Sequence, residues 1–407
     1  RLETWQTEFT LNYKRQLGSD HFIDALVGYT YQTTNRTQLI GSSSKYTDES
    51  LKQNNLSGGS QYAAPVSGES SSNLHSLIGR VNYTLLERYN ATATICADRS
   101  SRFSQNHNWG FFPSIGLSWN VNRESFLSNA TWLSDLKVRG SVGTVGNQEI
   151  GDYLYSTSYT TSTTGGNVHY TKSNAANSKL KWETTVSANI GIDATLWDGL
   201  VTLTADFYHK KTNDLLLTVP VDVAKYGVSS QLQNIGNVEN KGFELALGVT
   251  PIRERQLTWN IQGNLAYNKN EITNLGNHQE LNTNNYSILR KGEAVGSFYG
   301  LVFDGVVQAD EDISKLPTQN GSKPKVGEEK FRDINNDGKV NEYDRVILGH
   351  AQPNVTYGLS TSLKYKQLDV FVQFQGTANG HIYNALRRTL ESPTDCYNVS
   401  SVILDSW

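Results

Sequence analysis

Residues 333–344 carry the most specific chemical pattern in the chain, the sequence DINNDGKVNEYD. Oxygen-bearing groups stand at positions one, three, five, seven, nine and twelve of this stretch, namely Asp333, Asn335, Asp337, Lys339 (through its carbonyl), Asn341 and Asp344. Ca²⁺ takes six to eight hard oxygen ligands at about 2.3–2.6 Å, and alternate residues of a tight loop can point their oxygens inward. The spacing therefore predicts a loop that binds calcium.

Two features separate this stretch from an EF-hand. Asp344 stands where an EF-hand has a bidentate Glu. No helical pattern flanks the loop on either side. A turn rich in Asn, Asp and Gly that holds no ion is the alternative interpretation, because these residues favour turns by themselves.

No other constellation predicts catalysis. The 8 histidines show no paired metal spacing, and neither a phosphate-binding glycine loop nor a nucleophile elbow is present. Glu183, Glu328 and Glu329 could be considered as glycosidase carboxylates, but a solvated charge explains each of them. The net charge of −3 argues against a nucleic-acid partner, and Cys96 and Cys396 are too few for a disulfide framework. We expect a protein that is not an enzyme.

Outside residues 333–344, apolar and polar residues alternate along the chain with a period of two. Between 180 and 196 the even positions carry Trp182, Val186 and Ile190, whereas the odd positions carry polar or small residues such as Glu183 and Asn189. An apolar face opposite a polar face over this length is typical of a long strand between two different media. The same alternation recurs along the chain, and helical spacing is scarce.

The pattern predicts an all-β chain with about twelve antiparallel strands. We expect them at 7–16, 22–34, 74–86, 89–98, 109–121, 135–145, 180–196, 200–211, 241–250, 257–271, 354–365 and 368–376. In an up-and-down order, nearly all short turns fall at one end of the strands and the long connections (35–73, 146–179, 212–240 and 272–353) at the other. Greek-key crossings in a sandwich would give no reason for this parity.

Short turns at one end and long loops at the other are the asymmetry of outer-membrane barrels. Outward apolar residues would face lipid and the alternate polar residues a wet lumen. The expected aromatic girdles consist of Tyr13, Tyr89, Trp119, Trp197 and Tyr365 at the turn end and Tyr31, Trp109, Trp182 and Tyr267 at the loop end. A large soluble β-protein with one wet face per sheet is the alternative.

Several segments resemble the SusC/RagA family of TonB-dependent outer-membrane transporters. These segments are RYNATATICADRSSRF (88–103), FFPSIGLSWNVNRESFL (111–127), LKVRGSVGTVGNQEIGDY (136–153), VGSFYGLVFDGV (295–306) and the stretch from KFRDINNDGKVNEYDR onward (330–376). The resemblance covers most of residues 75–376 in the family's order. Cys96 stands where the family commonly has Arg, and Arg99 where it has Gly.

The resemblance implies TonB-dependent import of large nutrients, oligosaccharides or oligopeptides, across the bacterial outer membrane. It also implies a SusD-like surface lipoprotein as a lid, contact with TonB through a plug domain, and a barrel of 22 strands. We expect residues 1–407 to be one part of that barrel, with the plug and the last strands outside this sequence. The alternatives are an extracellular calcium-binding, β-rich carbohydrate hydrolase and a passive porin or adhesin barrel.

Overall fold

The computed structural model describes residues 1–48, 50, 54–392 and 398–405, so Cys396 lies outside the described residues. The chain divides into two compact units. Unit 1 comprises Arg1–Ala194 and Lys210–Gly236, and unit 2 comprises Thr195–His209 and Asn237–Trp407.

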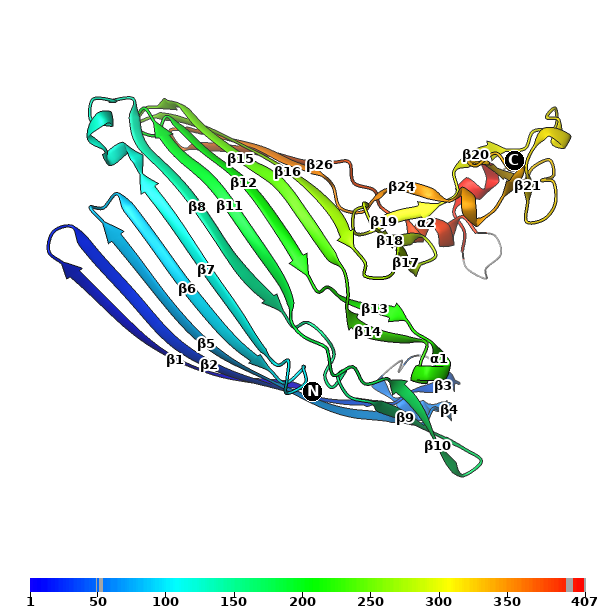
Figure 1. The fold of residues 1–407 in the computed structure, drawn as a ribbon. Helices are drawn as coiled ribbons and strands as arrows, with labels where there is room; N and C mark the ends of the chain where they lie inside the picture. The colour runs from blue at the N-terminus through cyan, green and yellow to red at the C-terminus, as the bar shows by residue number, and fades with distance from the viewer. Residues whose placement is uncertain (49, 51–53, 393–397, 406–407) are drawn as a thin grey trace. The chain divides into compact units, whose positions relative to one another are not determined.

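One antiparallel sheet of twelve strands has the order β1-β2-β5-β6-β7-β8-β11-β12-β15-β16-β25-β26 (Figure 1). These strands are β1 (Leu2–Leu17), β2 (His21–Ile40), β5 (Val66–Leu85), β6 (Tyr89–Ser100), β7 (Trp109–Asn120), β8 (Leu133–Asn147), β11 (Glu183–Leu196), β12 (Val201–Asn213), β15 (Asn237–Arg253), β16 (Leu257–Asn274), β25 (Val355–Tyr365) and β26 (Leu368–Ala378). Sheet neighbours follow one another along the chain, apart from small strands within the connections. The predicted all-β, antiparallel up-and-down architecture is thereby confirmed.

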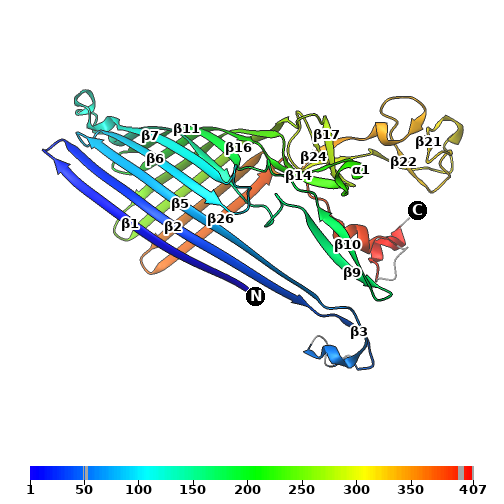
Figure 2. The same cartoon turned by 60° about the horizontal axis from the view of Figure 1, so that its bottom comes forward.

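Small elements occupy the longer connections of unit 1. They are β3 (Ser43–Tyr46), η2 (Leu56–Gly58), β4 (Gly59–Tyr62), η3 (Val121–Arg123), η4 (Ser125–Leu127), β9 (Ser158–Thr164), β10 (Asn167–Asn174), β13 (Leu216–Pro220), α1 (Val223–Tyr226) and β14 (Ser230–Asn234). β3 and β4 pair with each other beyond the end of β2, and β9 pairs with β10 (Figure 2).

The connection between β16 and β25 in unit 2 holds most of the remaining elements. They are β17 (Glu280–Asn284), β18 (Ser287–Arg290), β19 (Ser297–Gly300), β20 (Phe303–Val306), η5 (Ile313–Lys315), β21 (Thr318–Gln319), β22 (Glu329–Phe331), β23 (Lys339–Val340), η6 (Glu342–Asp344) and β24 (Val346–His350). After β26 come α2 (Ala385–Leu390) and η7 (Ser401–Asp405). No described helix has the length and apolar character that crossing a membrane would require.

The first strand pairs reach further than the alternation indicated. β2 and β5 stay in register from the pair His21 and Leu85 to the pair Ile40 and Val66, so the predicted loop 35–73 begins too early and ends too late. The reason is that 66–73 are mostly small polar residues, which give no apolar alternation. Backbone hydrogen bonds between strands do not need that alternation.

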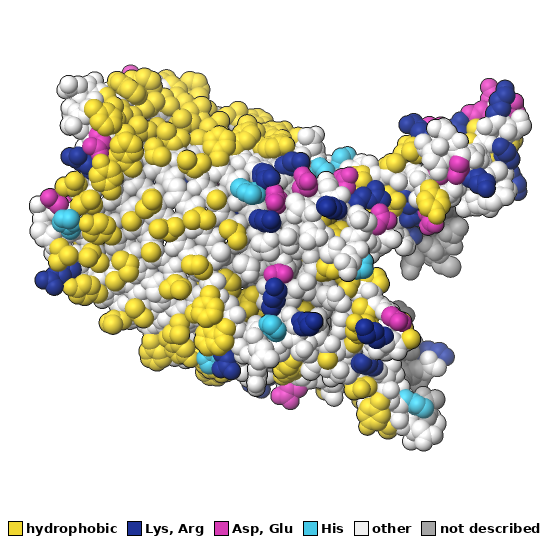
Figure 3. All heavy atoms as spheres, in the orientation of Figure 1, with side chains coloured by type: hydrophobic (Ala, Val, Ile, Leu, Met, Phe, Trp, Pro, Cys, Tyr) yellow, Lys and Arg dark blue, Asp and Glu magenta, His cyan; other side chains and the backbone are white. Residues whose placement is uncertain are grey.

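The two faces of the sheet differ in chemistry. Ile95, Ile115 and Leu117 are about half exposed or more on one face. On the other face, the Thr92 hydroxyl donates to Asn82 Oδ1 at 2.8 Å and Asn90 Nδ2 donates to the Ser118 hydroxyl oxygen at 3.3 Å. Charged side chains are sparse over the long strands and gather at their ends and on the loops (Figure 3). An exposed apolar band beside a hydrogen-bonded polar face is what a lipid-facing barrel wall requires.

The hydrophobic cluster of unit 1 consists of Phe103, Phe112, Leu180 and Trp182, each no more than 8% exposed. The ring of Trp182 meets that of Phe112 edge to face, with centroids 5.4 Å apart, and its Nε1 donates to the Asn108 carbonyl at 3.1 Å. The prediction that Trp182 belongs to a lipid-facing girdle is therefore wrong. β11 begins at Glu183, so residues 180–182 are free to turn inward onto Phe112.

Candidate functional site

Loop 333–344 is closed by its own polar side chains. The Asp333 carboxylate accepts the backbone N–H of Gly338 at 2.8 Å and that of Asp337 at 3.3 Å. Asn335 Oδ1 also accepts the N–H of Asp337, at 2.9 Å, and Asp337 Oδ1 accepts that of Lys339 at 2.8 Å. These bonds wind the first half of the loop tightly, with Gly338 in the left-handed region at φ +81°.

Asp344 closes the second half of the loop. Its buried carboxylate accepts the backbone N–H groups of Asn341 at 2.8 Å, Ile334 at 2.9 Å and Asn335 at 3.3 Å. These donors, the Asn341 N–H foremost, hold the pKa of the Asp344 carboxyl below its usual range. Asn341 Oδ1 in turn accepts the N–H of Tyr343 at 2.8 Å. The side chains of Asn341 and Asp344 also bond to each other's backbone, which forms a capping box at the start of η6.

The structure thus brings the predicted ligands into one hydrogen-bonded loop. Asp333, Asn335 and Asp337 lie together, and Asn335 Nδ2 is 3.3 Å from Asp337 Oδ2. Asp344 joins them through backbone groups. Among the described residues, no three side chains of His, Cys, Asp or Glu are grouped so that they could hold a metal ion. An ion at this loop would therefore depend on carbonyl, carboxamide or water oxygens besides the carboxylates, and calcium stays a prediction.

Loop 333–344 is fastened to the rest of its connection by a short parallel pairing. Lys339 and Val340 of β23 pair with Thr318 and Gln319 of β21. Val340 is 7% exposed, so its buried side chain anchors the loop.

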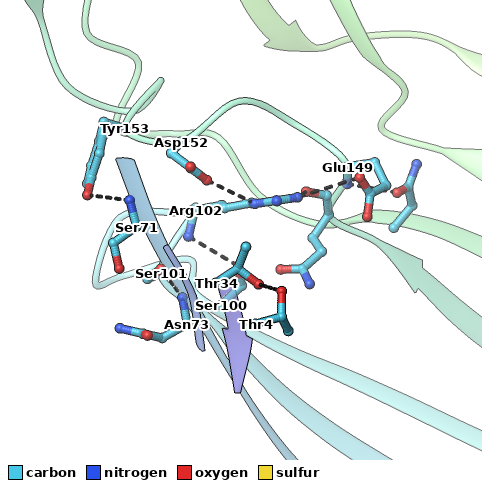
Figure 4. Close-up of polar contacts among 12 residues, drawn as sticks. Thr4, Thr34, Ser71, Asn73, Ser100, Ser101, Arg102, Glu149, Asp152 and Tyr153 are labelled. Atoms are coloured by element: carbon cyan, nitrogen blue, oxygen red, sulfur yellow. Dashed lines mark hydrogen bonds and ion pairs between the residues drawn. The ribbon is translucent and has the colours of Figure 1, made fainter. Parts of the chain in front are cut away.

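A second polar site in unit 1 joins two segments that sequence analysis singled out without giving their residues a role. Arg102, in the stretch 88–103, donates through Nε to Asp152 Oδ1 at 3.2 Å and through Nη1 to the Gln148 carbonyl at 3.2 Å (Figure 4). Its Nη1 also lies 3.6 Å from Glu149 Oε2. One guanidinium therefore ties residues 148–152, which follow β8, to the connection between β6 and β7.

Neighbouring contacts extend this tie to β5. The Tyr153 hydroxyl oxygen accepts the backbone N–H of Ser71 at 3.1 Å, and the Ser101 hydroxyl oxygen accepts that of Asn73 at 2.8 Å (Figure 4). The sequence offers Arg102 in one motif segment and Asp152 in another, but it gives no sign that the two are paired. Only the fold shows that they meet.

The polar face in unit 2 forms a shallow cavity of about 280 Å³. Its lining includes the carboxamides Gln262, Asn264 and Gln373 around Gly248 and Gly358. Small residues leave the space and carboxamides supply donors and acceptors, so this wall can contact a polar molecule without carrying charge.

Comparison with known proteins identifies the family. The family described as "TonB dependent receptor-like, beta-barrel" matches residues 2–322. TonB-dependent receptor P3 of Formosa agariphila is 33% identical over 98% of this chain and 41% of its own length. TonB-dependent receptor SusC of Bacteroides thetaiotaomicron is 33% identical over 76% of this chain and 32% of its own length.

A solved structure of the RagAB peptide transporter matches 100% of this chain and 45% of its own chain, with a TM-score of 0.83 and 25% identity. The outer-membrane transporter YddB of Escherichia coli shares the fold at 12% identity, with a TM-score of 0.55. The chain spans about two fifths of the length of the first curated relatives it matches. It belongs to the TonB-dependent receptor β-barrel family, whose members lie in the bacterial outer membrane.

Proposed function

We propose that the protein to which this chain belongs imports large polar nutrients, oligosaccharides or oligopeptides, across the outer membrane with energy supplied through TonB. The observation that carries the proposal is the match along 98% of the chain to a TonB-dependent receptor, joined by similarity to a peptide transporter over 100% of the chain. The relatives are receptors and transporters, which disfavours the hydrolase alternative.

A SusD-like surface lipoprotein is the proposed partner, acting as a lid over the long connections. Similarity to SusC and to RagAB supports it. Affinity purification of the full-length tagged protein from outer membranes should recover one lipoprotein in near-equal amount. Purification of the protein alone would contradict the partnership.

Import itself is tested by growth. A strain that lacks the gene should fail on one class of glycan or peptide and should grow normally on its monomers. The same defect in a strain without TonB separates active import from passive diffusion through a porin, which would not need TonB.

We also propose that loop 333–344 binds Ca²⁺ outside the cell. The support is the pre-wound first half of the loop, in which Asp333, Asn335 and Asp337 already lie together. Extracellular Ca²⁺ modules bind with dissociation constants of about 10⁻⁴–10⁻³ M, so a site of modest affinity fills at the cell surface. A bound ion would stabilise the loop in proportion to the logarithm of one plus the free Ca²⁺ concentration over that constant.

A further inference from the structure

A polar pocket of about 550 Å³ lies in unit 1, between the segment before β11 and the β13–β14 hairpin. Its lining residues are Ala176, Asn177, Ser178, Lys179, Lys181, Asp214, Tyr226, Gln231, Gln233 and Asn234. These residues lie outside the segments quoted for the family resemblance and outside the predicted calcium loop.

The local sequence explains why two lysines line the pocket. Leu180 is 0% exposed and Trp182 is 6% exposed, since both pack in the hydrophobic cluster. In extended chain, neighbouring side chains point to opposite sides. Lys179 and Lys181 are accordingly exposed on the side away from the cluster.

The hairpin follows the same logic. Leu232 of β14 packs against the hydrophobic cluster, so Gln231 and Gln233 on either side of it face the other way. Both glutamines line the pocket. The segment before β11 and strand β14 therefore each turn one side to the hydrophobic cluster and the opposite side to the pocket.

Carboxamides lock these two segments together. Asn234 Oδ1 accepts the N–H of Lys181 at 2.9 Å, and Asn234 Nδ2 donates to the Lys181 carbonyl at 2.8 Å. Asn177 Nδ2 donates to the Leu232 carbonyl at 2.9 Å, and Gln231 Nε2 donates to the Ala176 carbonyl at 2.9 Å. The walls are thus fixed before any ligand arrives, which lowers the entropy cost of binding.

The charge in the pocket is unbalanced. Lys181 Nζ is paired with Asp214 at 2.8 Å. For Lys179, the described part of the chain offers its ammonium no hydrogen bond or ion pair. The same holds for the Tyr226 hydroxyl and for Gln233 Oε1. One cation, one phenol and one carboxamide acceptor are left to meet a ligand.

The lining contains no Leu, Ile, Val, Phe or Trp. Sites for ordinary ligands are mostly apolar with a few polar groups, so this composition favours a ligand that is polar over its whole surface. A sugar, with hydroxyl groups around the edge of its ring, comes closer to that condition than a peptide with apolar side chains. The Lys179 ammonium favours a sugar that carries an anionic group.

We propose that this pocket binds a carboxylate-bearing sugar unit, with the carboxylate at Lys179 and sugar hydroxyls at Gln233 and Tyr226. This inference rests on the proposed import function and names the class of substrate. A charge-assisted hydrogen bond between an ammonium and a carboxylate is short and roughly twice as strong as a neutral one.

The test measures binding to the full-length protein in detergent by calorimetry, with trigalacturonate as the probe and its methyl ester as the matched neutral probe. The wild type should bind trigalacturonate about tenfold more tightly than the ester, as loss of one charge-assisted hydrogen bond predicts. Lys179→Ala should lose the same factor, and Lys179→Arg should retain most of the affinity.

Lys291→Ala is the matched control, because Lys291 is exposed and lies in unit 2, outside the pocket. Equal affinity of the Lys179→Ala and Lys291→Ala proteins would overturn the proposal. So would equal binding of acid and ester, or the absence of binding. If the peptide Ala-Glu-Ala bound as tightly as trigalacturonate, the sugar class would be wrong.

Binding in detergent needs no TonB, so the two proposals fail separately. If wild-type cells show no TonB-dependent uptake although the purified protein binds trigalacturonate, the import proposal is wrong and the pocket proposal stands. If the Lys179→Ala protein binds trigalacturonate as tightly as the wild type and its strain takes up acidic oligosaccharides normally, the pocket proposal alone is wrong.

Discussion

Arg102 Nε lies 3.2 Å from Asp152 Oδ1 although 50 residues separate the two along the chain. Both side chains are about one fifth exposed. A largely buried guanidinium that meets a carboxylate and the Gln148 carbonyl holds two connections of unit 1 in one arrangement.

Replacing Asp152 by Asn should loosen this tie. The Asn side chain keeps an acceptor oxygen for the Arg102 guanidinium but loses the negative charge. A hydrogen bond to a charged group is stronger than one to a neutral group, so the change should cost about 1 kcal/mol. We expect a lower midpoint of urea unfolding and faster trypsin cleavage after Arg102. Asp369→Asn is the control, since its pair with Lys364 is 3.9 Å long and exposed. An equal shift in both variants would show that Arg102 has no special role.

Gly146→Ala should destabilise the hydrophobic cluster. A Cβ at position 146 would overlap the ring of Phe112, which is held against Trp182. Overpacking of this kind costs about 1–3 kcal/mol. Gly68→Ala should be neutral, because no atom of the described residues lies within 4 Å of its Cβ position. Chemical denaturation in detergent compares the two, and identical midpoints would contradict the packing.

The faces of the long strands predict where charge is tolerated. We expect Val186, Ile190, Leu203 and Leu245 to face lipid and Glu183, Asn189, Asp206 and Glu244 to face the lumen. Leu245→Arg should cost roughly 2–4 kcal/mol near the bilayer midplane, and Glu244→Arg should cost little. Folding yield into vesicles, read by heat-modifiable migration on a gel, tests this. Equal yields would refute the assignment of faces.

Calcium should protect the connection between β16 and β25. Protease cleavage between Ala309 and Glu342 should be faster in chelator than in millimolar Ca²⁺, and Asp337→Ala should remove the difference. Asp310→Ala, an exposed change in the same connection, should preserve it. If the wild type is cleaved at the same rate in chelator and in millimolar Ca²⁺, the loop is an ordinary turn that binds no calcium.

Loop 333–344 should stay closed in acid until the pH falls below about 4. The pKa of the Asp344 carboxyl is depressed by backbone N–H donors, Asn341 first. A depressed pKa contributes stability above the ordinary aspartate pKa of about 3.9, and this contribution is lost as pH falls through the folded value. The loop should therefore resist pepsin at pH 4 and open below it, whereas Asp344→Ala should open it at neutral pH as well. Opening of the wild type already at pH 5 would contradict the depressed pKa.

The strands could be predicted from the sequence because alternation is a local property. The even positions from Thr184 to Leu196 are mostly apolar and the odd positions are polar or small. A strand with two such faces must lie between an apolar and a polar environment. Twelve strands in up-and-down order followed from this pattern and from the parity of the connections. The hydrogen bonds within 333–344 were also within reach, since each joins residues close in sequence.

Tertiary structure alone decided what the connections do. Trp182 continues the alternation of β11 in sequence, yet it turns inward because Phe112 and Leu180 offer it a buried surface. Arg102 meets Asp152, and Lys181 meets Asp214, only after the strands between them have set the register. Contacts between distant residues depend on how loops close and which surfaces remain to be covered, and no periodicity in the sequence records that.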